Sequence, residues 1–198
     1  MTLLKSYYAL CKPNVVYMML ICAFVGMLLA EEAVSSFSYL CISLFGIALC
    51  ASSAAAINQV IDRKTDASMT RTDQRPLPKG ELSVMHASIF AMTIGVIGAL
   101  ILFFYVNTLT MLLTIGSLIG YAFIYTVYLK RATPQNIVIG GLAGAAPPLL
   151  GWSSVTNTID PYALLLVLLI FVWTPPHFWA LAIYRKDEYA KESIPMMP

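Results

Sequence analysis

The sequence predicts an all-α protein, built as a bundle of helices that crosses a membrane several times. Hydrophobic residues make up 59% of the 198 residues, charged residues only 11%, and the mean hydropathy is +0.78. A soluble domain typically has about 25% charged residues. The apolar residues also gather into segments of about 20 residues, which is the length that a helix needs to cross a bilayer.

Six segments are long and apolar enough to be transmembrane helices, namely 14–30, 37–57, 84–106, 109–129, 136–155 and 162–184. No small-residue cleavage motif follows the first segment, so we interpret it as a retained span and not as a signal peptide. The fifth is interrupted by a Gly-Gly pair at 140, by Gly144 and by a Pro-Pro pair at 147. Those glycines fit two interpretations, close helix packing or a wall against a substrate.

The charges between the segments predict an orientation. All 12 lysines and arginines precede the first segment, lie in the second or fourth link, or follow the sixth segment. The positive-inside rule makes that side cytoplasmic, together with both ends of the sequence. The first residues lack the Arg- and Ser-rich amphipathic pattern of a transit peptide, which favours a bacterial inner membrane.

Composition excludes two kinds of site. The net charge of +2, with no basic run outside the links, argues against a nucleic-acid partner. The four cysteines, Cys11, Cys22, Cys41 and Cys50, lie in or beside apolar segments and form no Cys-x-x-Cys pair. We interpret them as small hydrophobic side chains, not as disulfide partners or metal ligands.

Three polar residues follow the second apolar segment at a spacing of four: Asn58, Asp62 and Asp66. On a helix they would share one face. Carboxylates at the mouth of a transmembrane helix are unfavourable unless they have a function. Mg²⁺ takes oxygen ligands and is often held by one or two carboxylates together with substrate phosphates. We therefore predict a Mg²⁺ site in the long second link, residues 58–82, which we expect to be a cytoplasmic loop.

Basic residues next to this motif suit a diphosphate. Arg71 and Arg75 are four residues apart and could clamp it through bidentate hydrogen bonds. Secondary candidates are Arg63, Lys64 and Lys130. The competing interpretation is a loop of solvated charges that only sets the topology.

A second acidic pair, Asp187 and Glu188, follows the sixth segment on the same side. Two acidic clusters on one face could bracket a diphosphate and its metal ions. If the diphosphate leaves an allylic ester, a carbocation remains, and aromatic faces stabilise cations. Trp173 and Trp179 near the end of the sixth segment could provide them, although tryptophans also mark membrane interfaces.

The spacing Asn58-x3-Asp62-x3-Asp66, followed by Arg71 and by Arg75-Pro-Leu-Pro, resembles the intramembrane prenyltransferases of the UbiA superfamily. The haem O synthase branch of that superfamily is similar in further stretches, at 12–13, 130–152, 175–182 and 194–198. Together these motifs extend over essentially the whole chain.

The resemblance implies a UbiA-type bundle with a central cavity that opens to lipid, of which about six spans out of nine are present. It also implies transfer of farnesyl from farnesyl diphosphate to the 2-vinyl group of haem b, with water addition, to give haem O on the way to haem A for terminal oxidases. Association with haem A synthase or with terminal oxidase assembly is implied as well.

By position, the resemblance makes Asn58, Asp62 and Asp66 the first Mg²⁺ motif, and Asp187 and Glu188 the second. The predicted catalytic residues are Asp62, Asp66 and His177; His177 could be a base, a haem contact or a packed polar residue. The predicted substrate-binding residues are Lys12, Arg63, Lys64, Arg71, Arg75, Lys130, Trp173 and Trp179.

Two departures from the family pattern matter. In the second motif Glu188 replaces an Asp and Glu192-Ser193 replaces a small pair, so its ligand set stays open. The chain is also shorter than the nine-span pattern, so we interpret residues 1–198 as one truncated domain and expect weak or no activity from them alone.

Two other functions stay open at this point. One is UbiA-type prenylation of an aromatic quinone precursor. The other is a transporter or a non-catalytic assembly protein, since broken helices also line transporter sites. The polar residues cluster at one membrane face and not near the midplane, which disfavours the transporter.

Overall fold

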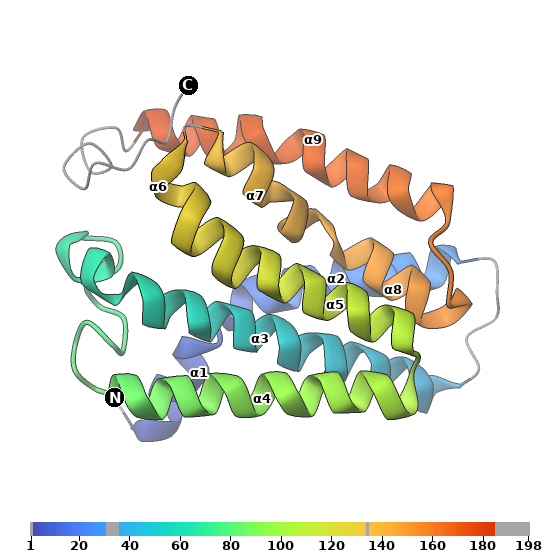
Figure 1. Ribbon diagram of the computed structural model, residues 1–198, viewed down its shortest axis with the longest axis horizontal. Helices are drawn as coiled ribbons and strands as arrows, with labels where there is room; N and C mark the ends of the chain where they lie inside the picture. Colours follow the sequence, from blue (N-terminus) through green and yellow to red (C-terminus); the bar gives the residue numbers. More distant parts are fainter. Residues whose placement is uncertain (1, 31–35, 134, 185–198) are drawn as a thin grey trace.

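The computed structural model describes residues 2–30, 36–133 and 135–184, and these form a helical bundle (Figure 1). The helices are α1 (Leu3–Leu10), α2 (Pro13–Leu29), α3 (Phe37–Ser68), α4 (Val84–Tyr105), α5 (Thr108–Ile119), the π-helix η1 (Gly120–Leu129), α6 (Lys130–Ala132), α7 (Asn136–Ala145), α8 (Pro147–Thr156) and α9 (Pro161–Tyr184). The four cysteines are free in this structure.

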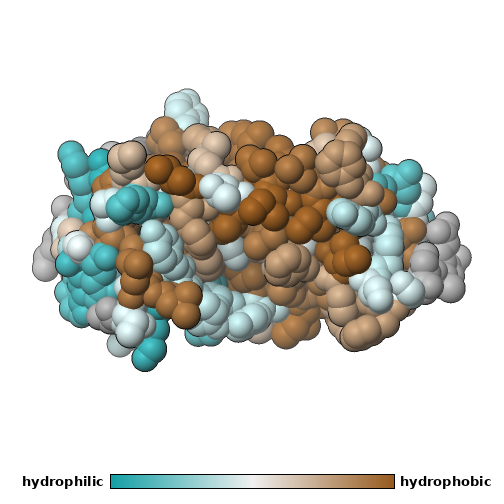
Figure 2. Space-filling view, turned by 90° about the horizontal axis from the view of Figure 1, so that it is seen from below, coloured by the Kyte–Doolittle hydropathy of each residue, from teal (hydrophilic) through white to brown (hydrophobic). Residues whose placement is uncertain are grey.

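The predicted spans are confirmed closely. Among the described residues, five helices are long and apolar enough to cross a membrane, and a sixth is added if α1 and α2, bent by 47°, count as one span. For example, the segments predicted at 84–106 and 162–184 are α4 and α9. Figure 2 shows hydrophobic residues over the middle of one face and hydrophilic residues gathered at its left end. The protein is therefore a multi-pass membrane protein.

One boundary is wrong. Residues 58–68, which the sequence pattern predicts as loop, are the last three turns of α3, which has 32 residues. A helix of that length measures about 48 Å, whereas the hydrocarbon core of a bilayer is about 30 Å thick. The helix continues because neither glycine nor proline occurs between Gly46 and Pro76. The acidic motif therefore lies on a rigid helical extension beyond the apolar part of α3.

Small residues bring α3 and α4 into close contact. Ser53 Oγ donates to the carbonyl of Ala91 at 2.8 Å. A Cβ on Gly98 would lie 2.8 Å from Cys50 Sγ, so only a glycine permits this approach. The pair forms a firm base from which the end of α3 projects.

The break that we predict in the fifth span is confirmed. Helices α7 and α8 meet at Ala146, and the Pro-Pro pair begins α8, where a missing N–H is tolerated. A Cβ on Gly140 would overlap the Tyr125 ring, and one on Gly141 would lie 2.9 Å from Thr174 Cγ2. At these two glycines the structure therefore supports close packing, of α7 against η1 and α9.

The last ten residues of the fourth predicted span form a π-helix, η1, which periodicity does not reveal. Thr126 Oγ1 donates to the carbonyl of Tyr121, five residues earlier, at 2.8 Å. Short π-helical segments are often found at functional sites. In this protein η1 leads directly into α6 and Lys130.

The elements that carry the predicted site lie at one end of the bundle. Figure 1 shows the end of α3, the short α6 and the end of α9 together at the left. The first acidic motif and Lys130 therefore share one side, as predicted. Asp187 and Glu188 lie outside the described residues.

Candidate functional site

The acidic motif forms a buried face on α3. Asn58 and Asp62 are each 5% exposed, and Asp66 is 4% exposed. Asn58 Nδ2 donates to Asp62 Oδ2 at 2.9 Å, which confirms that these two residues share a face. Buried carboxylates require compensating partners.

Two basic residues from separate parts of the chain supply those partners, and a third contacts Asn58. Lys130 Nζ lies 2.8 Å from Asp62 Oδ2, and Arg75 Nη1 lies 2.6 Å from Asp66 Oδ2. Lys12 Nζ donates to Asn58 Oδ1 at 2.5 Å. We refer to these six residues as the charged network: Lys12, Asn58, Asp62, Asp66, Arg75 and Lys130.

The loop after α3 turns back on itself and thereby places Arg75. Thr72 Oγ1 donates to the carbonyl of Asp66 at 2.9 Å, and the Thr72 amide donates to the carbonyl of Met69 at the same distance. The Arg75 amide then donates to Thr72 O at 3.1 Å. Leu77 is buried against Leu10 and its neighbours and holds the loop to the bundle.

Thr126 completes the network from η1, and sequence reasoning missed it. Its hydroxyl accepts a hydrogen bond from Asn58 Nδ2 at 3.1 Å. Thr126 and Lys130 are four residues apart in an otherwise apolar stretch. That polar pair was the available signal, because such residues share a helix face.

The network carries more positive than negative charge. Three cations face two carboxylates, an excess of one positive charge. Lys12 lies in the break ahead of α2. The excess of positive charge suits an anionic ligand.

The oxygen donors of this face fit Mg²⁺. Within residues 2–30, 36–133 and 135–184, no group of three or more His, Cys, Asp or Glu side chains is placed to hold a metal ion. Asp62 and Asp66 supply two carboxylates, and Mg²⁺ is typically held by one or two carboxylates with substrate phosphates and water. The residues present therefore fit a metal ion whose coordination the substrate completes.

Three other predicted basic residues lie apart from the network. Lys64 and Arg71 are exposed. Arg63 Nη1 donates to the carbonyl of Val60 in its own helix at 2.9 Å. Their substrate-binding roles stay predictions.

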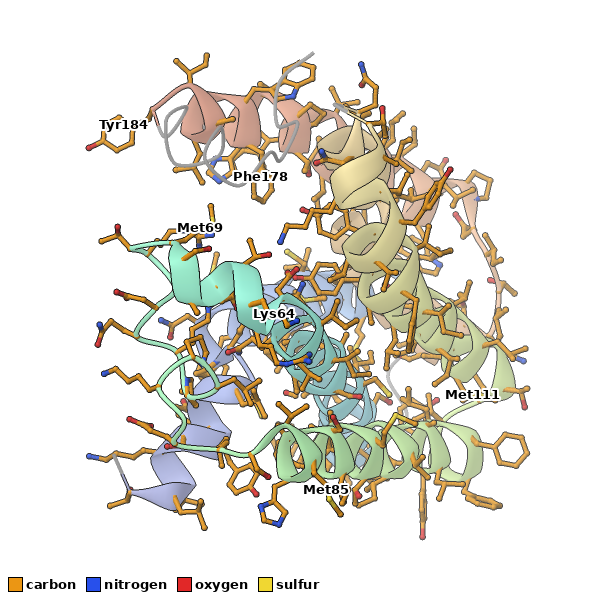
Figure 3. The ribbon with its side chains drawn as sticks, turned by 60° about the vertical axis from the view of Figure 1, so that its left-hand side comes forward. Lys64, Met69, Met85, Met111, Phe178 and Tyr184 are labelled. Carbon is orange, nitrogen blue, oxygen red and sulfur yellow. The ribbon has the colours of Figure 1, made fainter. Side chains whose placement is uncertain are left out.

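The aromatic residues predicted at the end of the sixth segment lie on α9. His177 stacks on Trp173 with ring centroids 4.4 Å apart and meets Phe178 edge-on at 5.4 Å. Trp179 is half-buried. In Figure 3, Phe178 lies on the side of α9 toward the end of α3, whereas Tyr184 points away from the bundle. The roles predicted for His177, Trp173 and Trp179 stay predictions.

The sequence is similar to known prenyltransferases. Residues 19–198 match the UbiA prenyltransferase family. A protoheme IX farnesyltransferase of Hahella chejuensis is 61% identical over 194 residues, which cover 98% of this chain and 65% of that protein. A protoheme IX farnesyltransferase of Vibrio vulnificus is 58% identical over 194 residues, and the match again covers 98% of this chain and 65% of that protein. The chain thus spans 65% of the length of these relatives.

The fold is similar to that of solved structures. A UbiA homolog from Archaeoglobus fulgidus, bound to DMAPP and Mg²⁺, superposes with a TM-score of 0.81 at 19% sequence identity. The match covers 98% of this chain and 68% of that chain. The predicted UbiA-type bundle is confirmed.

Proposed function

The chain belongs to the UbiA prenyltransferase family, and we propose that the protein transfers farnesyl from farnesyl diphosphate to the 2-vinyl group of haem b. Water addition then gives haem O. The observation that carries the diphosphate part is the charged network, in which Lys130 and Arg75 pair with two buried carboxylates and Lys12 donates to the neighbouring Asn58. The relatives named protoheme IX farnesyltransferase support haem b as the acceptor.

Asp62, Asp66 and the side-chain oxygen of Asn58 are the residues that would hold Mg²⁺. A metal ion bound there would neutralise the diphosphate and make it a better leaving group. Both carboxylates now accept hydrogen bonds from basic side chains, at 2.6 and 2.8 Å. A metal ion bound at these Oδ2 atoms would take the place of Lys130 and Arg75.

We assign the released cations to the diphosphate. Lys130, Arg75 and Lys12 already lie beside the motif, so a small change in side-chain conformation lets each of them contact a phosphate oxygen. Charge balance favours joint binding of metal and diphosphate. With one divalent ion alone the network would hold three positive charges in excess, and a prenyl diphosphate brings about two to three negative charges.

The reaction breaks the C–O bond of the allylic ester, and the bonding electrons leave with the diphosphate. The vinyl group of haem b attacks the farnesyl carbon, and water adds to the resulting cation with loss of a proton. We assign Trp173 and Trp179 to shielding the cationic intermediates. We assign His177, stacked on Trp173 at 4.4 Å, to accepting the proton.

We also propose the orientation that the basic residues predict, with the charged network on the cytoplasmic side of a bacterial inner membrane. Farnesyl diphosphate would then reach the network from the cytoplasm. The apolar farnesyl chain would lie along the bilayer-embedded helices. In this arrangement the diphosphate of the farnesyl donor lies near water and its hydrocarbon chain lies in an apolar environment.

The test is mass spectrometry of haems extracted from membranes that express the full-length protein, either as wild type or as Asp62→Asn. We expect a farnesyl-plus-water mass increase on haem b with the wild type only. Asp160→Asn is the matched control, because Asp160 precedes α9 at the opposite end of the bundle, where its Oδ1 accepts from the Tyr162 amide at 2.7 Å.

Other outcomes separate the parts of the proposal. A prenylated ring acid in place of modified haem would support the diphosphate site and refute the haem acceptor. Haem O formation by Asp62→Asn at the wild-type rate would refute the assignment of the motif.

A further inference from the structure

The break between α1 and α2 holds Lys12 in an unfavourable backbone conformation. Lys12 has φ 50° and ψ 58°, in the left-handed region. That region is unfavourable for a residue with a Cβ. Pro13 follows, and the residue before a proline prefers an extended conformation. Neighbouring contacts must therefore hold Lys12 in place.

Gln59 makes such contacts on the backbone just before Lys12. Its Nε2 donates to the carbonyl of Leu10 at 2.8 Å and to that of Ala9 at 3.3 Å. Carbonyls in the last turn of a helix lack partners within the helix, so Gln59 caps the end of α1. Gln59 is only 1% exposed, and the contact lies within the bundle.

Adjacent residues of α3 thus hold both parts of Lys12. Gln59 binds the backbone that leads into Lys12, and Asn58 accepts from its ammonium group at 2.5 Å. Gln59 is rotated by about 100° from Asn58 around α3, and its amide donates to the end of α1. It therefore acts on the charged network through Lys12.

We propose that Gln59 is a positioning residue, which holds the α1–α2 break so that the Lys12 ammonium group reaches the diphosphate. The inference rests on the proposed function, since it takes the ligand of the charged network to be a prenyl diphosphate. A purely structural role for Gln59 would affect folding but would not act through Lys12. The two roles differ in how changes at Gln59 and Lys12 combine.

The test is a double-mutant cycle on the full-length protein in detergent. Isothermal titration calorimetry measures the Kd for inorganic pyrophosphate in saturating Mg²⁺. We expect Gln59→Met and Lys12→Met each to weaken binding about tenfold, and the double variant to be no weaker than Lys12→Met. The KM for farnesyl diphosphate should rise in both single variants and should rise no further in the double variant. The KM for haem b should stay unchanged.

Ser6→Ala is the matched control. Ser6 is buried on α1, the helix that Gln59 caps, and its Oγ donates to Glu81 at 2.7 Å, away from Lys12. Losing this bond should leave pyrophosphate binding unchanged. If Gln59→Met does not fold, Gln59→Leu serves in its place, because it is uncharged and lacks the N–H donor.

Two results would overturn the inference while leaving the proposed function intact: wild-type pyrophosphate binding in the Gln59 variant, or additive losses in the double variant. Additive losses would mean that Gln59 acts independently of Lys12. A wild-type protein that binds no pyrophosphate would instead refute the diphosphate site itself, and the inference with it.

Discussion

Both ends of the bundle bury polar side chains, but of different kinds. At the end opposite the charged network, Asn107 Nδ2 donates to the carbonyl of Ser153 at 2.9 Å, and Thr110 Oγ1 lies 3.0 Å from Ser153 Oγ. Tyr39 Oη donates to the carbonyl of Ser154 at 2.5 Å. We refer to these five residues as the neutral cluster: Tyr39, Asn107, Thr110, Ser153 and Ser154.

The neutral cluster has a structural explanation. Its donors largely bond backbone carbonyls near the end of α8, and Asn107 Oδ1 also accepts from the Thr110 amide as the N-cap of α5. These carbonyls lie in the last turn of α8, where side-chain donors commonly complete the hydrogen bonding of a helix end. Every group involved is uncharged, so the cluster has no surplus that calls for a ligand.

The charged network differs, because a contribution to the stability of the protein does not explain why these charges are buried. Replacing a buried ion pair by apolar residues is often neutral or stabilising, so three cations around two carboxylates add little to stability. The comparison teaches that burial of polar groups alone does not identify a site. An excess of one sign of charge, gathered from distant segments, does so more reliably.

The largest expected effect is at Asp66. Asp66→Asn should lower farnesyl transfer at least about 100-fold, because it removes a proposed metal ligand. The thermal unfolding temperature should change little, since the amide oxygen of the introduced asparagine can still accept from Arg75. Haem O formation in detergent, with Asp160→Asn as control, measures this. Turnover within a factor of two of wild type would place the metal elsewhere.

Lys130→Met should change Mn²⁺ binding in opposite directions in the absence and in the presence of inorganic pyrophosphate. Without its cation, Asp62 is a better ligand, so Mn²⁺ alone should bind about tenfold more tightly. With inorganic pyrophosphate present, binding should weaken, because a phosphate partner is lost. Electron paramagnetic resonance of free Mn²⁺ measures both. If the Kd for Mn²⁺ changes in the same direction in both titrations, Lys130 does not exchange Asp62 for a phosphate group.

Asn107→Ala tests whether the neutral cluster serves stability alone. It removes an N-cap and two further hydrogen bonds, so the free energy of unfolding should fall by about 1–3 kcal/mol. Turnover per folded molecule should stay at the wild-type value. Thr93→Val is the control, because Thr93 is exposed and bonds only its own helix at Ile89. Loss of pyrophosphate binding in Asn107→Ala would give the neutral cluster a role in the site.

The smallest effect is expected at Lys79. It lies in the same loop as Arg75, but its side chain is exposed. Lys79→Ala should change the KM for farnesyl diphosphate less than about twofold, because exposed charges are well screened. Arg75→Lys is the comparison and should raise the KM more. An equal rise would show that net loop charge matters more than the ion pair to Asp66.

The sequence shows the spans well because length and apolarity are local properties. Predicted segments such as 84–106 agree with the helix bounds to within one residue. The acidic motif is visible for the same reason, through its spacing. The extension of α3 to Ser68 was missed because a charged segment resembles a loop in composition, whereas continuity depends on the absence of breakers.

The partners of the motif are harder to predict, since they depend on tertiary contacts. Arg71 and Arg75 are four residues apart, but the chain between them forms turns and not a helix, so only Arg75 reaches Asp66. Thr126 depends on the π-helical turn of η1. Gln59 depends on the end of α1, a helix that the span pattern does not show.

The most direct test of the central idea is Mn²⁺ binding to the wild-type protein with and without inorganic pyrophosphate, followed by electron paramagnetic resonance. If the charged network is a metal–diphosphate site held closed by its own cations, Mn²⁺ alone should bind weakly, and pyrophosphate should tighten binding at least about tenfold. Equal binding in both titrations, or none in either, would contradict it.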